Sequence, residues 1–175
     1  MNRRMGKTNI FFYDIIFTGL IFLAILGYLM HWAPYRLEFK EQIGIFLLGA
    51  DRIGWYLSNP AVVASIAGDW LTQFYINGRM GAMLSVLLLA AGWLGLSRFI
   101  RLSENGARFS GLILTVPMLA EAFFLTYLNY PVSATVGLVI SIWMACGLVK
   151  IKNPKLSQWV YWAAVPAAFV IAGGH

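Results

Sequence analysis

Long apolar stretches alternate along this chain with short clusters of basic residues, and this alternation constrains the fold more than any other feature. Nine of the thirteen Lys and Arg residues fall in three clusters. The clusters are Arg3, Arg4 and Lys7; Arg98, Arg101 and Arg108; and Lys150, Lys152 and Lys155. Basic residues accumulate on the cytoplasmic side of polytopic membrane proteins. The pattern therefore predicts a membrane protein that keeps all three clusters in the cytoplasm.

The apolar runs are long enough to cross a bilayer as helices. At ~1.5 Å per residue, about 20 residues span the ~30 Å hydrocarbon layer. The runs are continuous, whereas a transmembrane barrel would show alternation. Pro34 is expected to end the first run, and Pro117 and Pro166 are expected to kink later ones. We predict an all-α membrane protein with a single transmembrane domain over residues 1–175. Its five transmembrane helices are expected at about residues 10–31, 80–97, 109–128, 132–149 and 156–172.

The same charges orient the chain. A cytoplasmic N-terminus and five crossings place the C-terminus outside, and the first run is interpreted as a retained signal anchor of the bacterial inner (cytoplasmic) membrane. The net charge of +6 could indicate nucleic acid binding. The basic residues cluster at membrane boundaries instead, where they meet anionic headgroups. Membrane lipids are therefore the expected partners, and nucleic acid is not.

The external segment over residues 33–79 differs from the other connections, because it is too long for a turn and too apolar for a solvated loop. Asn59-Pro60 predicts the start of a helix, and Gly78 is a plausible end. Apolar residues recur between them at helical spacing, while Ser65, Asp69, Thr72, Gln73 and Asn77 share the other face. The pattern predicts one or two interfacial helices in this first external loop.

Four acidic residues of the external segment are candidates for chemistry. They are Glu38, Glu41, Asp51 and Asp69. Such groups could bind a divalent cation, or one could act as a general base that activates an acceptor hydroxyl. The candidate catalytic residues are Asp69, Asp51 and Glu41. Alternatively, these acids are solvated partners of Arg36, Lys40 and Arg52.

Two further residues are candidates for binding substrate or lipid. Glu121 lies within the predicted third span, where a carboxylate is costly and indicates proton relay, ion coordination or headgroup binding. Alternatively it is protonated and bonded to a neighbouring helix. Arg79 lies on the external side, where it could hold a lipid phosphate or pair with Asp69 or Asp51. Asp14 is expected to reach the cytoplasmic interface or to pair with a basic residue there.

Other chemistry finds little support in the sequence. His31 and His175 lack a third ligand at a recognisable spacing, so no metal site is predicted. Cys146 is the only cysteine and is expected to be a packing residue. No phosphate-binding loop or nucleophile elbow is present, and the sequence leaves any cofactor unknown.

Several segments are similar to a family pattern. They are Phe46-Leu47-Leu48, Trp55-Tyr56-Leu57-Ser58-Asn59-Pro60, Asp69-Trp70-Leu71-Thr72-Gln73-Phe74-Tyr75, Leu128-Asn129-Tyr130-Pro131 and Ala172-Gly173-Gly174. The chain resembles a family of bacterial polytopic inner-membrane proteins known only as a domain of unknown function. It departs from that family's Pro-Gly-Gly element at 59–62 and from its Tyr-x-Pro ending at 76–78. Members are usually several times longer, so the resemblance implies an N-terminal part of a larger protein or a truncated product.

A second similarity concerns layout alone. Membrane glycosyltransferases that use polyprenyl-phosphate sugars also begin with one span and an external loop of two interfacial helices, and an acid of that loop acts as base or metal ligand. This implies a lipid-linked glycosyltransferase-like module at the outer face, with a polyprenyl-phosphate lipid as partner. The alternative is a non-enzymatic subunit or scaffold of a membrane complex, with a protein partner or self-association. A small transporter, with Glu121 and Asp14 on one polar path, is the third hypothesis.

Overall fold

The protein is a bundle of helices, seen here in a computed structural model that describes residues 5–43, 46, 49–102, 111–151 and 154–173. Every element in these ranges is helical, and none is a strand. The elements are α1 (Met5–His31), α2 (Pro34–Ile43), α3 (Ala50–Ser58), α4 (Val62–Thr72), the 3-10 helix η1 (Gln73–Ile76), α5 (Gly78–Leu102), α6 (Thr115–Leu125), α7 (Val132–Val149) and α8 (Pro154–Ala172). The predicted all-α class is confirmed.

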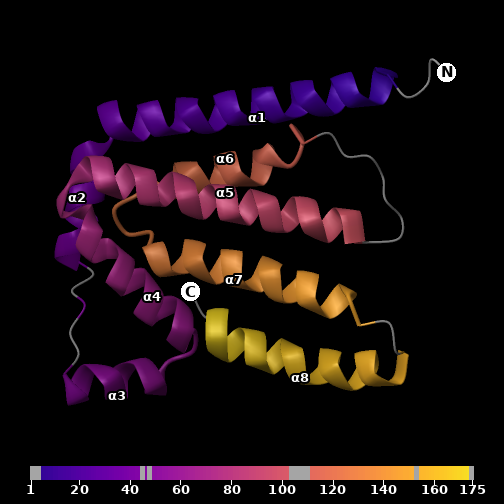
Figure 1. Cartoon of the computed structure of the whole chain (residues 1–175). Helices are drawn as coiled ribbons and strands as arrows, with labels where there is room; N and C mark the ends of the chain where they lie inside the picture. The colour runs from indigo at the N-terminus through magenta and orange to yellow at the C-terminus, as the bar shows by residue number, and fades with distance from the viewer. Residues whose placement is uncertain (1–4, 44–45, 47–48, 103–110, 152–153, 174–175) are drawn as a thin grey trace.

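The helices form two groups. Helices α1, α5, α6, α7 and α8 lie side by side with roughly parallel axes, and each runs opposite to the one before it (Figure 1). Helices α2, α3 and α4 gather at the end of this bundle where α1 stops and α5 starts (Figure 1). We call this end the α2 end. Helix α5 packs most extensively on α7, and α4 packs on α7 and α8.

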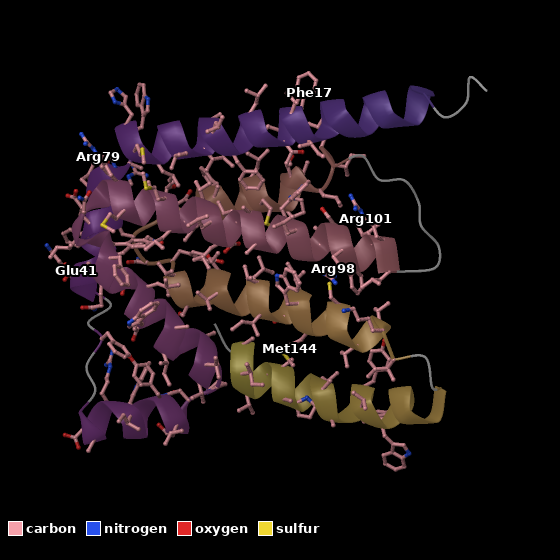
Figure 2. The ribbon with its side chains drawn as sticks, viewed as in Figure 1. Phe17, Glu41, Arg79, Arg98, Arg101 and Met144 are labelled. Carbon is pink, nitrogen blue, oxygen red and sulfur yellow. The ribbon has the colours of Figure 1, made fainter. Side chains whose placement is uncertain are left out.

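Two of the helices, α5 and α7, are each long and apolar enough to cross a membrane. A third crossing results if α1 and α2, which meet at a bend of 70°, are taken as one broken span (Ile15–His31 with Pro34–Gln42). Large apolar side chains cover the outside of the bundle. Phe17 on α1, for example, is 51% exposed and points away from its neighbours (Figure 2). These are the features of helices that face lipid.

The prediction of five spans is confirmed only in part. Helices α5 and α7 contain the predicted second and fourth spans, and α7 has the predicted bounds. The predicted third span contains only the 11-residue helix α6, which at ~1.5 Å per residue is too short to cross ~30 Å of hydrocarbon. Pro117 is the third residue of α6. In this first turn its missing N–H costs no helical hydrogen bond, so the predicted kink there was wrong.

The boundaries of the external helices also differ from prediction. Asn59 ends α3 instead of starting α4: its side-chain amide donates to the carbonyl of Trp55 at 2.8 Å, and its ψ of 148° is extended, as the following proline favours. Helix α4 begins after Ala61, whose φ of 67° is left-handed. Gly78 starts α5 instead of ending a helix.

Helix α4 turns its apolar face outward and its polar face inward. Val63, Ile66 and Trp70 are 47%, 37% and 51% exposed, whereas Ser65 and Thr72 are 6% and 4% exposed. The polar and small residues pack inward, where a Cβ added to Gly68 would lie 2.5 Å from the Cα of Ser133 on α7. Small residues allow such close approach between membrane helices. An amphipathic helix on a soluble protein shows the opposite arrangement.

Candidate functional site

The α2 end of the bundle collects the charged residues of the external segment. Glu41 on α2 and Arg79 at the start of α5 both lie at this end, whereas Arg98 and Arg101 lie toward the opposite end of α5 (Figure 2). For Arg98 and Arg101, the predicted separation from the external segment is therefore present in the fold. The contacts of each charged side chain decide whether that side chain remains available for a ligand.

Helix α2 lies across this end because one of its faces is apolar. Ala33, just before the helix, and Leu37 are 2% and 0% exposed, and Lys40 continues the same face at 4% exposed. The opposite face carries Tyr35 and Phe39, which are 60% and 49% exposed. The helix packs on α5 and η1 through the buried face. Residues 33, 37 and 40 follow the spacing of a helical stripe, so Lys40 is buried by its position.

Glu38 holds α2 to the start of α5. The backbone N–H of Gly78 donates to Oε1 of Glu38 at 3.2 Å. The first N–H groups of a helix lack partners within the helix and carry a partial positive charge, which a carboxylate satisfies. Glu38 therefore acts as a cap of α5. It does not pair with Arg36 or Lys40 in the described contacts.

Lys40 and Glu121 are joined through Tyr130. The ammonium of Lys40 donates to the backbone carbonyl of Tyr130, and it lies 5.8 Å from the centre of the Tyr130 ring. The Tyr130 hydroxyl donates to Oε1 of Glu121 at 2.7 Å, and the Thr135 hydroxyl donates to the same oxygen at 2.6 Å. Glu121 is 7% exposed. It is thus enclosed by α6, α7 and the connection between them.

Asp69 belongs to a separate cluster between α3 and α4. The Tyr56 hydroxyl donates to Oδ2 of Asp69 at 2.6 Å, and Nη2 of Arg52 lies 3.6 Å from the same oxygen. The Arg52 guanidinium also stacks over the rings of Trp55 and Tyr56 at 4.8 and 5.6 Å. Burial of Tyr56, together with its bond to Asp69, raises the pKa of the phenol. The arrangement joins the two helices.

Arg36 and Arg79 differ from the other cations of this end. In the part of the chain that the structure describes, the one ion pair within 4.0 Å joins Arg52 to Asp69. Arg36 donates from Nε to the Tyr35 hydroxyl at 3.1 Å. The guanidinium of Arg79 is exposed, and its backbone N–H donates to Oδ1 of Asn77 at 3.0 Å. Both guanidiniums are therefore free to bind an anion.

The structure divides the candidates predicted from the sequence. Asp69 and Glu121 have partners within the fold. The acids were expected to pair with Arg36, Lys40 and Arg52, and among the described residues only Arg52 forms such an ion pair, with Asp69. Asp51 and Glu41 have no described side-chain contact. The side chain of Asp14 lies outside the described residues, so the predicted transport path stays a prediction. Among the described residues, no group of three His, Cys, Asp or Glu could hold a metal ion.

Three residues of the cluster around Glu121 were not singled out from the sequence as site residues. They are Lys40, Tyr130 and Thr135. A signal for Lys40 was present, because it falls on the apolar stripe of Ala33 and Leu37. Tyr130 and Thr135 carried no such signal, since a tyrosine in a loop and a threonine in an apolar helix are ordinary in membrane proteins.

The model of one protein family, described as a family of unknown function (DUF6057), matches residues 9–175. No curated protein and no solved structure matches the chain.

Proposed function

Because this chain belongs to a family of unknown function, its role has to be inferred from its own residues, and we propose that it is an integral membrane protein that binds a phosphate-bearing lipid at its α2 end. In this proposal the protein lies in the bacterial inner membrane with five crossings. The N-terminus is cytoplasmic, and the α2 end and C-terminus face outside.

The alternating directions of α1, α5, α6, α7 and α8 support five crossings (Figure 1). The turns at 111–114 and 126–130 on either side of α6 would complete the third crossing. Arg98 and Arg101 lie toward the end opposite to α2 (Figure 2), which supports a cytoplasmic assignment for that end. Exposed Trp32 and Tyr35, at 72% and 60%, suit the headgroup level on the other side.

The observation that carries lipid binding is the pair of guanidiniums at Arg36 and Arg79, which lack a carboxylate partner in the described part of the chain. A guanidinium binds a phosphate through two parallel hydrogen bonds, and it is more weakly hydrated than an ammonium. The two residues lie in α2 and at the first turn of α5, and both elements meet where Gly78 approaches Glu38. A phosphate at headgroup level lies within reach of such side chains.

The specific chemistry that we propose for this site is glycosyl transfer from a polyprenyl-phosphate-linked sugar to an acceptor hydroxyl, with the polyprenyl phosphate as the leaving group. Among the three candidate catalytic acids, Glu41 is favoured. It lies at the same end as Arg79 (Figure 2), and it has no described side-chain partner, whereas Asp69 is bonded to Tyr56 and Arg52. Glu41 would then be the general base for an acceptor hydroxyl, and Arg79 would hold the phosphate.

Native mass spectrometry of the protein extracted gently from its own membrane tests this proposal. We expect a retained phosphate-bearing lipid that is lost from Arg79→Gln. Lys150→Gln is the matched control, because it removes an exposed cation beyond the last residue of α7. Retention of the same lipid by Arg79→Gln, or equal loss from both variants, would contradict a specific site at the α2 end.

A second candidate is a non-enzymatic subunit of a membrane complex. It is favoured by the internal bonds of Asp69 and Glu121, because two of the candidate acids then serve packing instead of chemistry. In the same spectrum, a protein partner at fixed stoichiometry without bound lipid would favour this candidate over lipid binding.

A further inference from the structure

A buried cation and a buried carboxylate occupy the junction between α2 and the connection from α6 to α7. Lys40 and Glu121 are 4% and 7% exposed. They come from positions far apart in the chain, and Tyr130 contacts both: its carbonyl accepts from Lys40, and its hydroxyl donates to Glu121. Neither charge has a described ion-pair partner within 4.0 Å.

Each charge is costly where it lies, unless the other is present. Oε1 of Glu121 accepts two hydroxyl hydrogen bonds, as a buried carboxylate requires. Burial lowers the pKa of Lys40 to about 8, and the charge of Glu121 opposes this shift. Removing one member of a buried pair leaves an uncompensated charge, whereas replacing both with neutral groups is often tolerated.

The consequence for the fold is the placement of α2. We infer that Lys40 and Glu121 form a charge-balanced pair, bridged by Tyr130, which fixes α2 across the end of the bundle and so positions Arg36 and Glu41. Lys40 and Glu121 are positioning residues in this inference. Only its consequence for ligand binding rests on the proposed function, because the placement of α2 can be measured without any ligand.

The reporter is a cysteine at Leu37, which is 0% exposed on the buried face of α2. Leu37→Cys is made in a Cys146→Ser background and labelled with a membrane-impermeant maleimide in the intact bilayer. We expect slow labelling in this parent. Glu121→Gln should raise the labelling rate by roughly 100-fold, because breaking a buried pair raises the open population to that order. Adding Lys40→Met to Glu121→Gln should return the rate to near the parent value.

Two controls separate an effect of the Lys40–Glu121 pair from a general loss of structure. Glu41→Gln removes a charge from α2 without touching the pair, and it should leave labelling unchanged. Tyr130→Phe keeps the carbonyl that binds Lys40 but loses the bond to Glu121, so its labelling rate should be intermediate. Hydrogen exchange of the α2 amides with Leu37 intact should follow the same order, which guards against an effect of the cysteine itself.

The outcomes are distinct. Labelling in Glu121→Gln at the parent rate would overturn the inference. Equal acceleration in Glu121→Gln and in the Lys40→Met, Glu121→Gln double variant would overturn charge balance, because removing the Lys40 charge would then restore nothing. If the labelling pattern is as expected while Arg79→Gln keeps its lipid, the inference about the Lys40–Glu121 pair holds and the proposed function fails.

Discussion

The hydroxyl of Tyr56 donates a 2.6 Å hydrogen bond to Asp69, and this bond joins α3 to α4 across a corner whose residue Ala61 has a left-handed φ of 67°. From the sequence, Asp69 is a candidate general base on the polar stripe of an amphipathic helix. Its position in the structure gives it a packing partner, and the proposed role of general base passes to Glu41.

The bond between Tyr56 and Asp69 predicts a loss of stability at alkaline pH. The pKa of Tyr56 is raised from 10.0 by burial and by the bond to Asp69. The native state then keeps the phenol proton to higher pH than the unfolded state does. This contribution is complete below pH 10 and is lost as the pH rises through the raised pKa. Unfolding in detergent should show this decline, and Tyr56→Phe should show a smaller one, because the pKa of Tyr75, which burial raises to about 12, still contributes. An identical decline in both proteins would refute the assignment.

The close contact between α4 and α7 predicts that Gly68 cannot be replaced. A Cβ at Gly68 would lie 2.5 Å from the Cα of Ser133, so the helix backbones must separate. We expect Gly68→Ala to cost about 1–3 kcal/mol of unfolding free energy. Gly54→Ala in α3 is the control, because nothing lies within 4 Å of its Cβ. It should be neutral or stabilise by up to ~1 kcal/mol. Equal effects of the two substitutions would contradict this packing.

The cap of α5 predicts different roles for two neighbouring acids. Glu38→Gln keeps an oxygen for the N–H of Gly78 but removes the charge at the helix N-terminus. We expect a loss of about 0.3–1 kcal/mol in the free energy of unfolding. Glu41→Gln, on the same helix, has no described side-chain contact and should leave stability unchanged. The comparison is made by chemical unfolding of the two variants in the same detergent, and a larger loss for Glu41→Gln would reverse the assignment.

The proposed topology predicts which positions an impermeant reagent reaches. In a Cys146→Ser background, a cysteine at exposed Gln42 should be labelled from outside the intact cell. A cysteine at exposed Lys150 should be labelled only after the membrane is permeabilised. Labelling of both positions in intact cells would rule out an odd number of crossings between residues 42 and 150.

The parts of the fold that sequence predicts best are the long helices. Apolar length and flanking charge are sufficient to locate α5 and α7, because a span in lipid has to satisfy its backbone within itself. Local signals did less well in the external segment. Asn59 can cap either the helix before it or the helix after it, and the choice depends on the carbonyl of Trp55, which it reaches at 2.8 Å.

Two features of the site could not be predicted because they depend on tertiary contacts. The residue pattern of α4 fits a helix whose apolar side is buried and equally a helix whose apolar side meets lipid. Only the packing of Gly68 on Ser133 decides between the two arrangements. The pairing of Lys40 with Glu121 joins positions 40 and 121 through a tyrosine in a loop. No local periodicity connects residues at that distance in the chain.

The contacts that hold α2, α3 and α4 have a consequence for biogenesis. Lys40 on α2 depends on the carbonyl of Tyr130, and the N–H of Ala61, just before α4, donates to the carbonyl of Phe169 on α8. Both partners leave the ribosome long after the segment that they hold. The contact of α2 with the 126–130 turn and that of Ala61 with α8 can therefore form only after those later parts of the chain have been made.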